Sequence, residues 1–144
     1  FYLIDQIQQV FLEALNDQRL FSLNKAFIGW MCNYLGIKTK IIDASQLSIK
    51  GKRGEHVTLI CKHLGILKYL SPSGAEDYLK QDFDSFQKKQ IKVYLHEYEH
   101  PTYKQVYSPF LPYASIIDLV LNEGENSLKI IRQGRKTPRM LAIK

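Results

Sequence analysis

A six-residue pattern occurs twice in this chain and constrains its fold more than any other feature. Cys32 to Ile37 and Cys61 to Ile66 both read Cys-x-x-Leu-Gly-Ile and start 29 residues apart. In each copy an apolar helical stretch ends at a glycine, which adopts the left-handed conformation that stops a helix. The interval is about what one helix, one turn and one strand require. The repeat therefore predicts helices that alternate with short strands, as in a parallel sheet covered by helices.

The spacing of apolar residues predicts the individual elements. Helices are expected over residues 2–15, 22–36, 55–64, 83–87, 115–124 and 127–132, with one more through Leu79, and strands over 37–42, 67–70 and 91–96. The predicted fold is α/β, a small open parallel sheet with helices packed on it. Because the chain begins at Phe1 inside a helical pattern, it is expected to be a fragment that lacks its N-terminal elements. Residues 1–132 are predicted to form a single α/β domain and residues 133–144 a mobile basic tail.

Composition narrows the class of function. Twenty Lys and Arg against 14 Asp and Glu give a formal charge of +6. Because these charges are scattered, we expect a basic surface that attracts anionic metabolites, and no nucleic-acid-binding stripe. No run of eighteen apolar residues occurs, which argues against a membrane span. The two cysteines, Cys32 and Cys61, lie in apolar helical patterns and favour buried thiols in a reducing cytoplasm.

The segment Ser71 to Asp77 follows the second predicted strand and opens a helix. Ligands of open parallel sheets bind beyond the carboxyl ends of the strands. The serine hydroxyls, the flexible Gly74 and the free N–H groups of the helix are suited to a phosphate or a carboxylate. The other interpretation is an ordinary turn capped by Ser73, with Glu76 and Asp77 in the first helical turn.

The segment from His100 to Gly124 joins an aromatic, polar loop to an apolar helix. Its prolines hold the loop extended, and they are Pro101, Pro109 and Pro112. Ser115 is expected to cap a helix that ends at Gly124. A rigid loop that leads into a buried helix is a candidate wall for a small-molecule site.

Several side chains of this segment have useful chemistry. Tyr103 and Gln105 offer hydrogen-bonding or stacking groups, and His100 is a candidate proton carrier. Structural roles are the alternative interpretation, since tyrosines often pack through their rings. Asp118 follows Ser115 at the spacing of a capping box, and Asn122 lies near the helix terminus.

Metal and thiol chemistry are not expected. The four histidines form two pairs, His56 with His63 and His96 with His100, without acidic or cysteine partners at ligand spacing. We therefore predict no metal site and no cofactor. Cysteine nucleophiles are also disfavoured, because a thiol buried by helix packing stays protonated.

Three stretches between about Leu20 and Gly124 resemble the WbqC-like family of bacterial proteins. They are LNKAFIGWMCNYLGIKTKIIDASQL, GEHVTLICKHLGILKYLSPSGAEDYL and HPTYKQVYSPFLPYASIIDLVLNEG. The last two combine several rare residue choices in a fixed order. The resemblance implies an association with genes for O-antigen and other surface polysaccharides, and activities that run toward transferases acting on sugar nucleotides.

From this resemblance we expect a cytoplasmic transferase, of acyl, aminoacyl or glycosyl type, that acts on an activated nucleotide sugar. The catalytic residues would be His100 and Asp118, one of them a general base. The substrate-binding residues would be Ser71, Ser73, Gly74, Asp77, Tyr78, Tyr103, Gln105 and Asn122. The alternative is a non-catalytic accessory protein of a polysaccharide gene cluster. The donor, the acceptor, the reaction type and the oligomeric state stay open.

Overall fold

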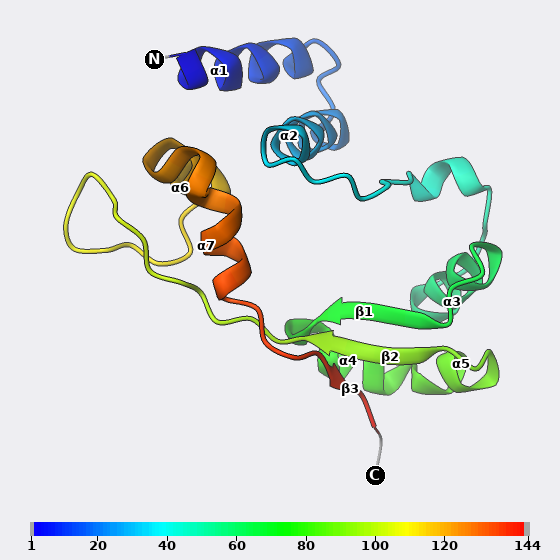
Figure 1. The fold of residues 1–144 in the computed structure, drawn as a ribbon. Coiled ribbons are helices and arrows are strands. Elements are labelled where there is room, and N and C mark those ends of the chain that lie inside the picture. The colour runs from blue at the N-terminus through cyan, green and yellow to red at the C-terminus, as the bar shows by residue number, and fades with distance from the viewer. Residues whose placement is uncertain (1, 143–144) are drawn as a thin grey trace. The chain divides into compact units, whose positions relative to one another are not determined.

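The structure is a computed structural model that describes residues 2–142 (Figure 1). Its α-helices are α1 (Tyr2–Leu15), α2 (Leu20–Tyr34), α3 (Arg53–His63), α4 (Glu76–Gln81), α5 (Phe83–Lys88), α6 (Ile116–Glu123) and α7 (Ser127–Gln133). Its strands are β1 (Lys68–Pro72), β2 (Lys92–His96) and β3 (Arg139–Met140). Three short 3₁₀ helices complete the list, η1 (Ala44–Leu47), η2 (Ser73–Ala75) and η3 (Gly124–Asn126).

The chain forms two compact units, each built from segments that are distant in the sequence. Unit 1 comprises residues 1–40 and 100–134, and unit 2 comprises residues 41–99 and 135–144. Unit 1 therefore holds α1, α2, α6 and α7, and unit 2 holds the sheet with α3, α4 and α5. The prediction of a single domain over residues 1–132 stays a prediction.

A three-stranded sheet in the order β1-β2-β3 organises unit 2. Strands β1 and β2 are parallel, with Lys68 opposite Lys92, and β3 joins β2 in the antiparallel direction. Helices α4 and α5 lie along one side of this sheet (Figure 1). This arrangement confirms the α/β class and the parallel pairing, and it adds an antiparallel edge strand.

Alternation along β2 builds the core of unit 2. Val93 and Leu95 are fully buried, whereas Lys92 is exposed and Tyr94 half-buried. Burying a side chain of this size stabilises a fold by about 1.5–3 kcal/mol. The remaining buried members come mainly from the helices and the strand ends: Cys61, Leu79, Phe86, Ile91 and Leu141.

The core of unit 1 forms between α2, α6 and α7. Met31, Leu35 and Val120 are buried there, and Trp30, Tyr34, Ile117, Leu128 and Ile131 pack around them together with Leu3 and Ile37. The predicted start of α6 is confirmed, because the Ser115 hydroxyl oxygen accepts a hydrogen bond from Ile117 N at 3.2 Å.

Both copies of the repeated pattern end a helix in the predicted way. Gly36 and Gly65 have φ values of 66° and 67°. Ile37 N donates to Cys32 O at 2.7 Å, and Ile66 N donates to Cys61 O at 2.8 Å. These bonds satisfy carbonyls that the ends of α2 and α3 would otherwise leave free.

Two sequence predictions differ from the structure. Residues 37–42 form no strand, and Ile41 and Ile42 are 54% and 38% exposed, because no neighbouring strand offers this segment a pairing partner. Part of the predicted basic tail, residues 133–144, is ordered within unit 2. Arg139 and Met140 form β3, and Leu141 is buried while its N–H donates to Val93 O at 2.9 Å.

Candidate functional site

Asp118 lies at the centre of a polar cluster in unit 1. Helix α6 presents its carboxylate to the loop that precedes the helix. Oδ2 accepts hydrogen bonds from the Tyr103 hydroxyl at 2.7 Å and from Gln105 Nε2 at 2.8 Å. Oδ1 accepts a bond from Asn122 Nδ2 at 3.1 Å. These four residues are thus in direct contact, and we call them the Asp118 cluster; that they form a catalytic or binding site stays a prediction.

The Asp118 cluster also fixes the backbone of the loop. The Gln105 amide exchanges two hydrogen bonds with the backbone of Leu111, with its oxygen accepting at 2.8 Å and its nitrogen donating at 3.1 Å. Asn122 Oδ1 accepts a bond from Val106 N at 3.1 Å, and Glu123 accepts one from Lys104 N at 2.9 Å. Because each bond joins the loop to itself or to α6, the loop is held in one conformation.

The contacts of Asp118 change the interpretation of this residue as part of a capping box. A capping box would direct the Asp118 side chain to the helix start, yet its carboxylate contacts Tyr103, Gln105 and Asn122 instead. Burial, together with the hydrogen bond to Asp118, raises the pKa of the Tyr103 hydroxyl. Tyr103 therefore stays protonated through neutral pH and donates to the carboxylate.

His100 lies among aromatic rings at the start of the same loop. Its ring centroid is 4.7 Å from that of Tyr113, 6.2 Å from that of Phe110 and 6.3 Å from that of Tyr103. Its Nδ1 atom is buried and has no hydrogen-bond partner among the residues that the structure describes. Buried polar atoms are normally satisfied, and His56 Nδ1 in unit 2 is likewise buried without a partner among the described residues.

The tip of this loop exposes several large apolar side chains. Their exposed fractions are 81% for Val106, 84% for Tyr107, 66% for Leu111 and 80% for Tyr113. Large exposed apolar side chains grouped on one loop are typical of surfaces that contact a ligand or a partner. The loop thus combines a rigid polar base with an apolar tip.

The second set of predicted site residues lies in unit 2, at the carboxyl end of β1. Ser71 is buried at 3% exposure beneath the sheet surface, whereas Ser73 and Gly74 are exposed on η2. The Asp77 side chain is 96% exposed, and the Tyr78 ring lies 5.1 Å from the Arg53 guanidinium. Ser73 is the first residue of η2 and not its cap, and neither Pro72 nor Ala75, which stand at the N-caps of η2 and α4, makes a side-chain capping bond.

A charged group at this edge of the sheet was not predicted. Arg139 of β3 pairs with Glu76 at 2.6 Å and with Glu97 at 3.2 Å, and Lys80 pairs with Glu76 at 2.9 Å. The hydrogen bond from Arg139, followed by that from Lys80, lowers the pKa of Glu76 to about 2. Sequence reasoning missed this group because a strand of two residues carries no periodic signal.

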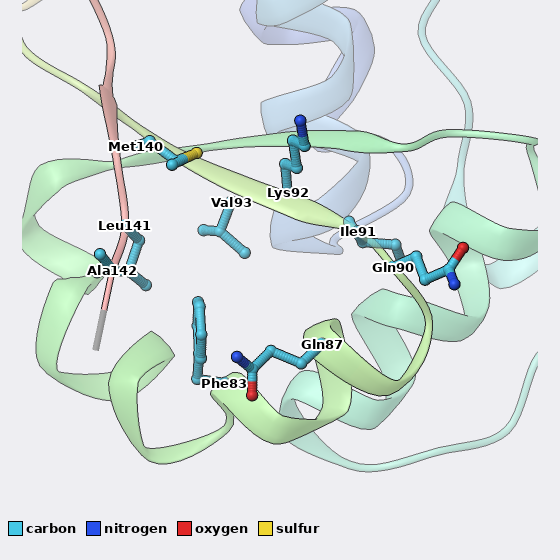
Figure 2. A pocket seen from close by; sticks show the side chains of 9 residues that line it. All are labelled: Phe83, Gln87, Gln90, Ile91, Lys92, Val93, Met140, Leu141 and Ala142. Atoms are coloured by element: carbon cyan, nitrogen blue, oxygen red, sulfur yellow. The ribbon is translucent and has the colours of Figure 1, made fainter. Parts of the chain in front are cut away.

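Two of the cavities in the described part of the chain lie outside these sets of residues. One, of about 540 Å³, opens between α5, the start of β2 and β3 in unit 2 (Figure 2). The other, of about 360 Å³, lies in unit 1 and is lined almost entirely by apolar side chains of α2, α6 and α7, with Cys32 in its wall. Neither cavity is lined by a residue predicted to bind substrate.

Among residues 2–142, no group of three or more His, Cys, Asp or Glu side chains is arranged to hold a metal ion. Within the same residues, no helix has the length and apolar character that crossing a membrane requires.

Burial raises the pKa of the Cys61 thiol, in line with its predicted protonated state.

The fold defines an α/β protein, and comparison with known proteins narrows this class to a family. The sequence profile of the WbqC-like protein family matches residues 2–130, so the chain belongs to that family. The chain is similar to the uncharacterized protein Rv1507c of Mycobacterium tuberculosis, with 27% identity over 133 residues. This similarity covers 92% of the chain and 56% of that protein's length. No solved structure matches the chain.

Proposed function

We propose that this chain belongs to a transferase that acts on an activated nucleotide sugar in bacterial surface-polysaccharide biosynthesis. The observation that carries the proposal is His100, whose buried Nδ1 lacks a partner beside a loop that the Asp118 cluster holds in place. Its support is the family membership together with this arrangement.

In this proposal His100 is the general base, which requires that substrate binding exposes its buried Nδ1. Histidine changes its charge state near neutral pH and accepts a proton from a hydroxyl or amino acceptor. Asp118 is a positioning residue, because its carboxylate oxygens already accept three hydrogen bonds from Tyr103, Gln105 and Asn122. The apolar tip of the loop would lie over the sugar or the transferred group.

The turn from Ser71 to Tyr78 is only a weak candidate for binding the phosphate groups of the nucleotide sugar. Helix α4 has only six residues, so its dipole is small, and Glu76 and Asp77 place carboxylates in its first turn. Ser71 is buried, so its hydroxyl reaches a ligand only if the sheet edge rearranges. Binding of the sugar phosphate by this turn stays a prediction.

The rival proposal is a non-catalytic accessory protein of a polysaccharide gene cluster. The exposed side chains of Val106, Tyr107, Leu111 and Tyr113 favour it, because a protein partner would bury this apolar tip. In that case His100 would only fill space among the rings.

A thermal-shift screen of nucleotide sugars separates the two proposals. A ligand that binds only the native state at about 100 times its Kd stabilises the fold by about 2.7 kcal/mol. The transferase proposal expects at least one nucleotide sugar to raise the Tm, and the matching free sugar to raise it less. A full panel without a stabilising compound would favour the accessory protein.

A further inference from the structure

The sheet of unit 2 has one face that the helices of that unit do not cover. Helices α4 and α5 lie along the side that buries Val93 and Leu95. Because strand side chains alternate, Lys68, Leu70, Lys92 and Tyr94 share the other face. Figure 2 shows Lys92 and Met140 extending from the strands on the side away from Val93 and Leu141.

Two rows of side chains cross this open face. The first is a pair of lysines, since Lys68 and Lys92 are direct partners in the parallel register of β1 and β2. Both are exposed, and neither forms an ion pair with any of residues 2–142. Like charges directly opposite each other destabilise a sheet. A pair of this kind is therefore a position that an anion would stabilise.

The second row is apolar and aromatic. Leu70, Tyr94 and Met140 are register partners across the three strands, and Leu70 and Met140 are each 52% exposed. This row lies two residues along the strands from the lysine pair, which is about 6.6 Å. A hollow of about 350 Å³ lies here, lined by Lys68, Leu70, Tyr94 and the segment Thr137–Pro138 with Tyr69.

We propose that this open face binds a nucleoside diphosphate. The pyrophosphate would lie over Lys68 and Lys92, and the base would stack on the ring of Tyr94 between Leu70 and Met140. Charge complementarity favours this ligand, because unit 2 holds 13 of the 20 basic and eight of the 14 acidic residues of the chain. Aromatic side chains beside basic residues on an open sheet bind bases and phosphates in the same way.

The proposal depends on the sheet alone and would hold for a protein without transferase activity. The experiment is isothermal titration of the wild-type chain with uridine diphosphate and, separately, with inorganic pyrophosphate at low salt. The double variant Lys68→Gln/Lys92→Gln is expected to lower the affinity for both ligands by about tenfold or more, because each lysine supplies a charge-assisted hydrogen bond. The variant Tyr94→Leu is expected to lower the affinity for uridine diphosphate by about fivefold or more and to leave the affinity for pyrophosphate nearly unchanged.

The matched control is Lys62→Gln/Lys88→Gln, which removes the same charge from helices α3 and α5. This control should retain the wild-type affinities within about twofold if the lysines of the sheet bind the pyrophosphate directly, and do not act only through the net charge of the chain. Without ligand, Lys68→Gln/Lys92→Gln should have a Tm no lower than this control, because the substitution relieves repulsion. No binding to the wild type, or equal weakening by both lysine pairs, would overturn the proposal. Loss of transfer in His100→Gln with intact uridine diphosphate binding would leave it standing.

Discussion

Asp118 illustrates how one half-buried carboxylate can hold a whole loop. Its two oxygens accept bonds from Tyr103, Gln105 and Asn122, and Gln105 in turn fixes the backbone of Leu111. Hydrogen bonds to a charged acceptor contribute about 1.5–3 kcal/mol each, more than neutral ones. We therefore expect the order of the loop to depend on this side chain more than on any proline.

The variant Asp118→Asn tests this role. An amide replaces one acceptor oxygen by a donor, so at least one of the three donors loses its partner. We expect the free energy of unfolding to fall by about 1–3 kcal/mol, measured by urea denaturation. The control Glu125→Gln neutralises an exposed carboxylate of the same unit and should change it by less than about 0.5 kcal/mol. Equal stabilities of the two variants would contradict a structural role for the cluster.

At the scale of elements, the helices were predictable because their signal is local. The helix over residues 2–15 and the glycine stops of α2 and α3 follow from apolar spacing and from left-handed glycines. Strand pairing is not local, so the pattern over residues 37–42 indicated a strand that has no partner. For the same reason, the sequence could not show that β3 pairs with β2, or that Asp118 contacts residues 13 and 15 positions away.

The start of α3 depends on a close approach between two elements. Gly54 N donates to Asp82 Oδ2 at 3.0 Å, and a Cβ atom at Gly54 would lie 2.5 Å from the Asp82 Cβ. Gly54→Ala is therefore expected to lower the free energy of unfolding by about 1–3 kcal/mol, because α3 must move away from Asp82. Gly29→Ala is the matched control, since nothing lies within 4 Å of its added Cβ in α2. It should stabilise the chain by about 0.5–1 kcal/mol in the same denaturation assay, and an equal loss in both variants would exclude the steric explanation.

Glu76 of α4 pairs with Lys80 and with Arg139 of β3, and these ion pairs predict a dependence on acid. The folded-state pKa of Glu76 is about 2, below its ordinary value of 4.5. Its contribution to stability is therefore complete above pH 4.5 and is lost as the pH falls toward 2. We expect the unfolding free energy of Glu76→Gln to fall less steeply across this window than that of the wild type.

The control for this acid dependence is Asp77→Asn, which removes the neighbouring carboxylate. That side chain is 96% exposed and lies 3.8 Å from Lys80. The unfolding free energy of Asp77→Asn should change with pH as that of the wild type does between pH 4.5 and 2. A Glu76→Gln curve parallel to the wild type would mean that Arg139 does not hold Glu76 in its charged form.

At the scale of the whole molecule, chemistry is divided between two units. Unit 1 carries His100 and the Asp118 cluster, whereas unit 2 carries the charged edge and the open sheet face. The family match covers residues 2–130 and so includes parts of both units.

The central claim is that His100 moves a proton during group transfer. The most direct measurement is the single-turnover rate of product formation from a hydroxyl or amino acceptor and the nucleotide sugar that raises the Tm most, followed by mass spectrometry. His100→Gln is predicted to lower this rate by about 10²–10⁴-fold, the usual contribution of a general base, without changing the shift in Tm. His63→Gln, at an exposed histidine of α3, should keep the wild-type rate. A wild-type rate in His100→Gln would contradict the account.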